Sequence, residues 1–121
     1  MANEVNIATS FRFSNGSAAE IRRGASFLAS PSSLRFNHAY HNVGITEEAM
    51  KLSEVGTPTR VWIKNHDATN FVQILSATSG TAILKVGPGE EYVFRFGSGV
   101  TAPYVIADTA ACNVEYMISD A

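Results

Sequence analysis

Cysteine is almost absent from the sequence, since Cys112 is the only one. A disulfide within the chain needs two cysteines and a cysteine-rich zinc site needs several, so both are excluded. One cysteine fits a protein that matures in a reducing cytosol. No basic residue stands beside Cys112 to lower its pKa, so we expect a buried free thiol and no thiolate catalysis.

Charged residues are also scarce, at 17% of the chain against about a quarter in an average soluble domain. The formal net charge of -2 gives no electrostatic reason to bind a phosphate backbone, so we expect no nucleic-acid partner. Apolar residues make up 45% of the chain. This surplus predicts that another chain covers part of the surface, with a homo-oligomer as the favoured arrangement.

Long hydrophobic runs are missing as well. The apolar runs fall far short of the roughly 18 residues that a membrane-spanning helix needs, so no membrane partner is expected. Residues 1–6 lack the basic segment and apolar stretch of a signal peptide, which predicts synthesis and assembly in a cytoplasm. Without a secretion signal, Asn15-Gly16-Ser17 is interpreted as a turn and not as a glycosylation site.

What the sequence does contain is strand patterning, strongest between Thr59 and Phe96. Short runs of β-branched and aromatic residues alternate there with Asn, Asp, Gly and Pro, which is typical of consecutive antiparallel strands. A polar turn over residues 65–70 separates the first two runs. Arg60, Trp62 and Lys64 are expected on one face of the first strand, opposite Val61 and Ile63. In the last run Tyr92, Phe94 and Phe96 share a face that we expect to be covered.

The rest of the chain continues the pattern. Strands are expected over residues 4–13 and 20–29, joined by an Asn-Gly turn, with Gly24 as a possible bulge. A third runs from residue 34 to about 43, with His38 and His41 on opposite faces. Further strands begin at Pro103, which is confined to a strand's edge or first residue, and at residue 113, where Val114, Tyr116 and Ile118 face inward.

Residues 46–54 are ambiguous, because Thr46 could cap a short helix that ends at Gly56, while an irregular extended chain fits equally well. About eight strands at spacings near a dozen residues predict an all-β protein, an antiparallel β-sandwich or jelly-roll-like fold with at most one short helix near 46–54. A length of 121 residues suits a single domain over 1–121.

Candidate catalytic patterns are weak. The adjacent His66-Asp67 pair lies in a turn-forming segment without a nucleophile elbow, so turn chemistry explains it better than hydrolysis. His38 and His41 leave opposite faces of one strand and cannot share a metal ion. Three scattered histidines do not supply a cupin metal site either. We therefore expect no enzyme activity, no cofactor and no metal site.

Residues 65–70 read Asn-His-Asp-Ala-Thr-Asn, Gly89-Glu90 precedes a predicted strand, and residues 111–116 read Ala-Cys-Asn-Val-Glu-Tyr. Together these segments resemble the small virion structural proteins of tailed bacteriophages, in which an Asn-x-Asp-x-Thr-Asn turn, a Gly-Glu before a strand and an Ala-Cys-x-Val-Glu-Tyr ending recur. The resemblance covers about the last 75 residues, and the first 40 match no family known to us. It implies a β-sandwich that coats or staples a capsid, or else a part of the tail or fibre. The matching segments are 56–58, 61–72, 89–90, 95–96, 102–104 and 112–116.

This resemblance makes a capsid cement, or decoration, protein the first expectation. Such a protein would sit on the virion capsid surface after assembly in the host cytoplasm, and its partners would be the major capsid protein and copies of itself, as a possible trimer. The alternative is a tail or fibre component with a carbohydrate-binding sandwich, using Trp62, Tyr92 or Tyr104 as a platform. The candidate protein-interface residues are Arg12, Arg22, Arg23, Arg35 and Trp62.

Overall fold

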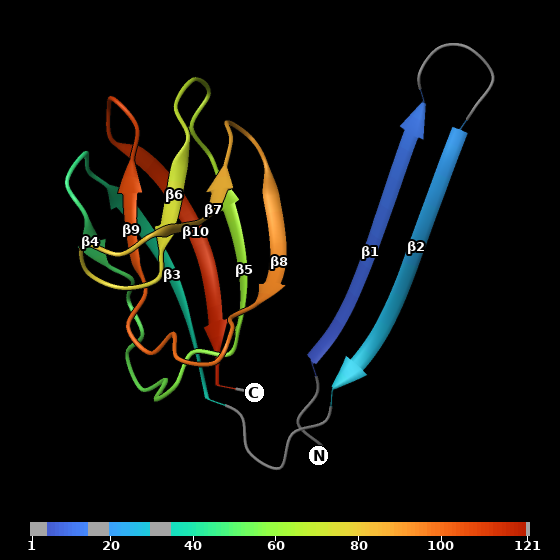
Figure 1. The fold of residues 1–121 in the computed structure, drawn as a ribbon, viewed down its shortest axis with the longest axis horizontal. Helices are drawn as coiled ribbons and strands as arrows, with labels where there is room; N and C mark the ends of the chain where they lie inside the picture. The colour runs from blue at the N-terminus through green and yellow to red at the C-terminus, as the bar shows by residue number, and fades with distance from the viewer. Residues whose placement is uncertain (1–4, 15–19, 30–34, 121) are drawn as a thin grey trace. The chain divides into compact units, whose positions relative to one another are not determined.

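The computed structural model describes residues 5–14, 20–29 and 35–120, and these form ten strands without a helix (Figure 1). All the strand pairings are antiparallel, so the all-β antiparallel prediction is confirmed. The contacts group the chain into two compact units, Met1–Ser33 and Leu34–Ala121. The single domain over 1–121 stays a prediction, and the two units are described separately below.

The first unit is a hairpin of β1 (Val5–Ser14) and β2 (Glu20–Ala29). Its register is unbroken from Val5 opposite Ala29 to Ser14 opposite Glu20, so the possible bulge at Gly24 does not form. A Cβ at Gly24 would lie 3.2 Å from the backbone oxygen of Thr9, which favours glycine for its small size. The expected Asn15-Gly16 turn lies outside the described residues.

The second unit places eight strands in two four-stranded sheets, ordered β3-β10-β5-β8 and β4-β9-β6-β7. The pairs are nested, since β3 pairs with β10, β4 with β9, β5 with β8 and β6 with β7. One long ribbon, folded over into two sheets, is the jelly roll. The strands are β3 (Phe36–Val43), β4 (Glu48–Ala49), β5 (Arg60–Asn65), β6 (Val72–Leu75), β7 (Ala82–Val86), β8 (Glu91–Arg95), β9 (Tyr104–Ala107) and β10 (Cys112–Ser119).

The core lies between the two sheets and follows the alternation of the sequence. Along β5 Val61 and Ile63 are buried, while Trp62 and its neighbours Arg60 and Lys64 are half-buried on the opposite side, as predicted. Val114, Tyr116 and Ile118 of β10 are each at most 1% exposed, which confirms the expected inward face. Alternate residues point to opposite faces of a strand, so the outward residues of β3, β10, β5 and β8 share one surface.

Three expectations at the edges of the sheets are resolved by the structure. Residues 46–54 take the extended alternative, because Glu48–Ala49 pairs with β9 and Met50 donates its N–H to the Pro103 carbonyl. Pro103 immediately precedes β9, which lies inside its sheet. The expectation that all three aromatics of residues 92–96 are covered is wrong for Tyr92, which is 40% exposed because β8 is an edge strand.

Candidate functional site

The surface richest in exposed hydrophobic and interacting polar side chains is the outward side of the sheet β3-β10-β5-β8, which we call the outer face. Four of its hydrophobic side chains are markedly exposed: Phe36 at 52%, Tyr40 at 69%, Met117 at 41% and Val93 at 39%. Exposed aromatic and methionine side chains on one face are typical of protein contact surfaces.

Glu115 of β10 lies at the centre of a polar cluster on the outer face. One carboxylate oxygen is 2.7 Å from Nε2 of His38 on β3, and the other is 2.9 Å from Nε2 of His66, which follows β5. Both bonds hold the pKa of Glu115 below its ordinary value, and the bond to His66 has the larger effect, followed by the bond to His38. Tyr40 also hydrogen-bonds this carboxylate, and its own pKa is raised as a result. The cluster connects three separate segments of the chain.

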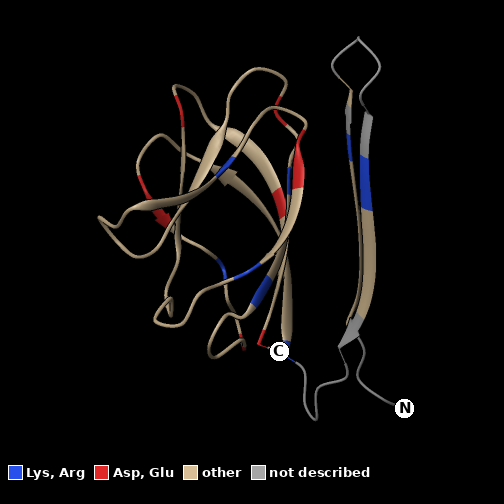
Figure 2. Cartoon of the chain, turned by 45° about the vertical axis from the view of Figure 1, so that its right-hand side comes forward, with Lys and Arg blue, Asp and Glu red and all other residues tan. Residues whose placement is uncertain are grey.

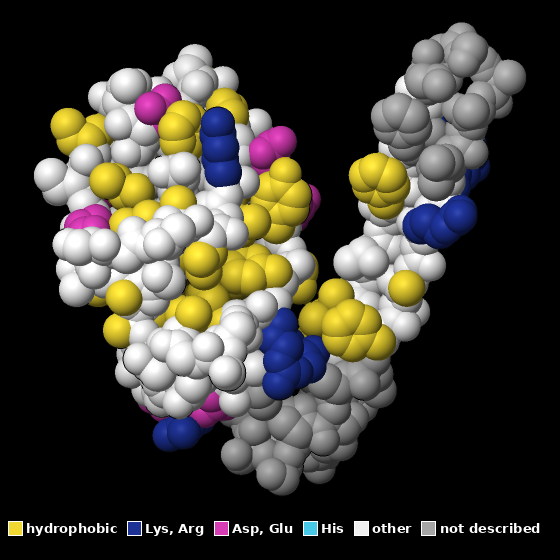
Figure 3. Space-filling view, viewed as in Figure 1, with side chains coloured by type: hydrophobic (Ala, Val, Ile, Leu, Met, Phe, Trp, Pro, Cys, Tyr) yellow, Lys and Arg dark blue, Asp and Glu magenta, His cyan; other side chains and the backbone are white. Residues whose placement is uncertain are grey.

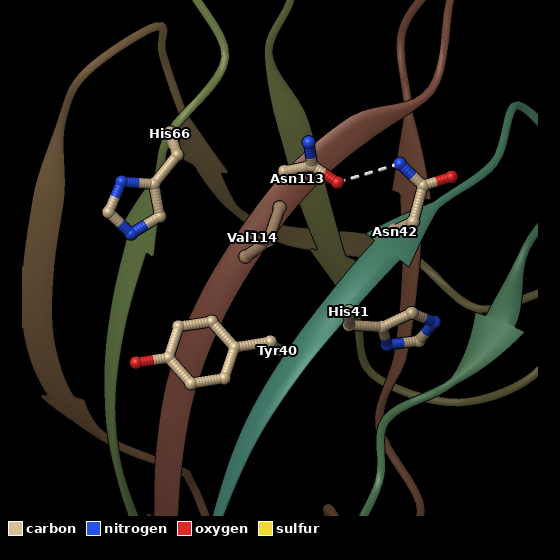
Figure 4. A pocket seen from close by; sticks show the side chains of 6 residues that line it. All are labelled: Tyr40, His41, Asn42, His66, Asn113 and Val114. Carbon is tan, nitrogen blue, oxygen red and sulfur yellow. Dashed lines mark hydrogen bonds between the residues drawn. The ribbon is translucent and has the colours of Figure 1, made fainter.

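An open pocket lies next to this cluster and is drawn in Figure 4. Tyr40 and His66 lie on one side of it, and Asn42 donates a hydrogen bond of 2.8 Å from its amide nitrogen to Asn113 on the other. His41 is directed away from Tyr40 (Figure 4), which confirms that His38 and His41 leave opposite faces of β3. The lining is mainly apolar in area, and its histidine and asparagine side chains offer a few hydrogen-bonding groups to a partner surface.

The buried polar groups behind the sheet are structural. Tyr116, with no exposed surface, accepts the backbone N–H of Lys51 at 2.8 Å and lies 3.0 Å from Nδ1 of His41. The other ring nitrogen of His41 faces Glu48 at 3.6 Å. Burial raises the pKa of Tyr116, so its hydroxyl stays protonated. These groups connect β10, β3 and the strand β4 inside the sandwich.

The His66-Asp67 pair works as a turn, in agreement with its sequence interpretation. Asp67 accepts the backbone N–H groups of Asn70 at 2.7 Å and Thr69 at 3.0 Å. These two bonds, the Asn70 bond first, lower the pKa of the carboxyl group. His66 is directed to Glu115 instead, so the adjacent histidine and aspartate do not form an acid-base couple.

Cys112 is fully buried, and burial followed by the nearby charges of Asp67 and Asp108 raises the pKa of its thiol. A protonated buried thiol is a poor nucleophile. Among the residues that the structure describes, no group of three or more His, Cys, Asp or Glu side chains could hold a metal ion.

The five predicted interface residues fall in three places. Arg12, Arg22 and Arg23 belong to the hairpin, whose described part carries blue bands and no red one in Figure 2. Arg35 stands just before β3, where its Nε is 2.7 Å from the Asp120 carboxylate. Trp62 lies on the outer face and donates its indole N–H to Glu91 at 3.0 Å. Within the second unit, Trp62 therefore shares the outer face with the Glu115 cluster, and Arg35 pairs with Asp120.

Sequence reasoning missed the Glu115 cluster. The sequence signal was limited to Glu115, which lies opposite the inward face of Val114, Tyr116 and Ile118 in its predicted strand, and nothing placed His38 beside it. Their contact depends on the register that sets Met117 opposite His38 and Glu115 opposite Tyr40, and this register joins segments far apart in the sequence.

The three aromatic residues proposed as a sugar platform do not share one face. Trp62 lies on the outer face, Tyr104 belongs to β9 in the other sheet, and Tyr92 sits opposite Ile63 on the inward side of edge strand β8. A flat platform needs aromatic rings on one surface, so these three residues do not make one together.

Comparison with known proteins gave no match to a family model, to a curated protein or to a solved structure. Within the described ranges, no helix is long and apolar enough to cross a membrane. The geometry of the chain itself is therefore the basis for its functional interpretation.

Proposed function

We propose that the protein is a structural virion protein of a tailed bacteriophage, a cement protein that binds the outer shell of the capsid and stabilises it. The observation that carries the proposal is the hairpin, which exposes both aromatic and arginine side chains. Its register places Val5, Ile7, Phe11 and Phe27 on one face, which Arg23 shares opposite Phe11, and places Arg12 opposite Arg22 on the other face. Phe11 is 62% exposed and Phe27 is 52% exposed, and hydrophobic side chains are visible on the described hairpin in Figure 3.

A hairpin of two ten-residue strands is at best marginally stable alone in water, so a surface that covers its apolar side would stabilise it. The hairpin carries exposed arginines on both faces, Arg12 opposite Arg22 and Arg23 opposite Phe11, and a cationic surface is complementary to an acidic one. An extended arm with exposed aromatic and arginine side chains suits attachment to a large protein shell. The mechanism is mass action, because a protein that binds the assembled shell and not free subunits stabilises the shell.

The jelly roll supports this proposal only at the level of fold, since both viral capsid proteins and lectins use it. The resemblance of residues 56–116 to phage virion proteins favours the capsid. No observation favours the carbohydrate-binding alternative over capsid binding. A clear hit on a glycan array would make carbohydrate binding the better proposal.

The test mixes the purified protein with capsids of its phage that lack it. We expect co-sedimentation and a higher capsid melting temperature. Arg12→Glu with Arg22→Glu should abolish binding, and the matched variant Lys51→Glu, an exposed charge reversal in the sandwich, should bind normally. Failure of the native protein to bind, or binding without a rise in melting temperature, would refute the proposal.

A further inference from the structure

The outer face has an apolar row at its centre. Met117 of β10, Trp62 of β5 and Val93 of β8 are direct neighbours in successive strands. Met117 and Val93 are exposed and Trp62 is half-buried. Tryptophan, methionine and aliphatic side chains in one continuous strip are typical of the centre of a protein interface.

Two charged rows flank this strip, each two residues further along the strands. On one side the register aligns Glu115, Lys64 and Glu91, a row with a net negative charge. On the other side it aligns Arg60 with Arg95, a row with a net positive charge, in which Arg95 is exposed and Nε and Nη1 of Arg60 are buried. Along the strand direction, the outer face therefore presents a negative row, an apolar row and a positive row in succession.

We propose that the outer face binds the outer face of a second copy of the chain, about a twofold axis that runs along the apolar row. Rotation about this axis reverses the strand direction, so the negative row of one copy faces the positive row of the other. Glu91 then meets the partner's Arg95, and Arg95 meets the partner's Glu91. The apolar strips meet along the axis, with Trp62 against the partner's Trp62.

The charge pattern selects this axis over the other twofold arrangement. If the twofold axis ran along the strands instead, each charged row would lie against the same row of the partner. Rows of the same net charge would then repel each other. Lys64, which comes to face the partner's Arg60, lies between Glu115 and Glu91 in its own row, and these carboxylates offset its charge. The face is thus complementary to itself in one orientation.

The size of the face sets the strength of the contact. Four strands spaced about 4.8 Å apart, over about six residues at about 3.4 Å each, cover roughly 400 Å² in projection on each copy. The two faces together amount to roughly 800 Å², less than the roughly 1,200 Å² at which stable specific interfaces begin, so the contact is weak. A reversible dimer, whose population rises with concentration, is therefore expected. The inference goes beyond the proposed function and does not depend on binding to capsids.

Sedimentation velocity over a series of concentrations tests the inference on the full chain. The native protein should dimerise. Arg95→Glu and Glu91→Arg, each alone, should weaken the dimer at least about tenfold, because each places like charges opposite each other twice. An equimolar mixture of the two variants should form one-to-one heterodimers, and the chain with both substitutions should dimerise again.

Lys85→Glu reverses a charge on β7 in the other sheet and should dimerise as the native chain does. Each variant's melting temperature confirms that it is folded. A native chain that stays monomeric or forms a trimer would overturn the inference, as would a dimer insensitive to both reversals. If each single variant dimerised weakly and the mixture of the two variants did not recover dimerisation, Glu91 and Arg95 would not face each other. Capsid binding by a monomeric native chain would leave the proposed function standing while this inference fails.

Discussion

Single residues hold the turns and the core in ways that side-chain chemistry explains. In the turn after β5, Asn65 is fully buried and accepts the Asp67 N–H at 2.9 Å, while its amide nitrogen donates to the carbonyls of Asn70 and Val86. Asp67 then closes the turn through Thr69 and Asn70. Asn and Asp are favoured in turns because their side chains bond nearby backbone groups.

Replacing Asp67 by Ala should lower the melting temperature by several degrees at neutral pH, because the N–H groups of Thr69 and Asn70 lose their acceptor. The pKa of Asp67 is depressed in the folded state, so its stabilising effect is present above its ordinary pKa and is lost as the pH falls below it. Thermal unfolding of Asp67→Ala and of the control Asp108→Ala, monitored from pH 7 to pH 3, measures both effects. Equal melting temperatures for native protein and Asp67→Ala at pH 7 would contradict the structural role.

Replacing Tyr116 by Phe should destabilise the fold by about 1–3 kcal/mol, because a buried N–H of Lys51 and Nδ1 of His41 both lose the phenol oxygen. The ring volume is nearly kept, so cavity formation contributes little. Urea unfolding measures the change, and Tyr104→Phe, at a half-buried position of β9, is the matched control. A change no larger than that of the control would mean that the two groups find other partners.

At the scale of the element, the Glu115 cluster ties β10 to β3 and to the segment after β5. Its carboxylate has a depressed pKa, so its contribution to stability is complete above the ordinary value of 4.5 and disappears as the pH falls through the lower folded value. Glu115→Gln should therefore lower the melting temperature at pH 7 and flatten its decline below about pH 4.5. Scanning calorimetry from pH 7 to pH 3 tests this, with the exposed Glu54→Gln as control. An unchanged pH profile would show that the cluster does not stabilise the sheet.

A substitution of Trp62, also at the scale of the element, tests whether the side chain belongs to a contact surface or to the folded core. Trp62→Ala removes half-buried apolar area from the outer face, so it should weaken self-association by about tenfold while the melting temperature changes little. Tyr104→Ala, at a half-buried position in the other sheet, should leave association unchanged. A large loss of stability with unaltered association would assign Trp62 to folding instead.

Much of the element pattern could be predicted from the sequence, because alternation directly encodes which side of a strand is buried. The faces of β5 and β10 were predictable residue by residue. The candidate site was not, since His38, His66 and Glu115 meet only through strand order and register. Residues 46–54 were ambiguous because local capping favours a helix there, while pairing of β4 with β9 decides for an extended chain.

At the scale of the whole molecule, the second unit contains the buried hydrophobic cluster, whose members run from Ala39 to Ile118. We therefore expect residues 34–121 to fold without the hairpin, with a melting temperature within a few degrees of the full chain. Circular dichroism during heating of the two proteins gives the comparison. A shortened chain that is unfolded, or much less stable, would support a single domain over 1–121.

The fold class, an antiparallel β-sandwich or jelly-roll-like fold, followed from strand number and spacing, but the nesting of the strand pairs did not. In the nested arrangement, each strand that precedes the β6–β7 turn pairs with a strand that follows this turn. The alternation of residues along one strand does not show which strand is its partner. Tyr92 illustrates the difference, since its pattern predicted a covered ring and the position of β8 at the edge exposed it.

The nested pairs also have a kinetic consequence. The β6–β7 ribbon closes across a short loop and should form first, with pairing then spreading outward in zipper fashion to β3 and β10, the pair of highest contact order. Because β10 comes last among the eight strands of the second unit and lies in the middle of its sheet, the outer face does not exist until β10 has been synthesised. Neighbouring nascent chains on one messenger that lack β10 would therefore be unable to pair through this face.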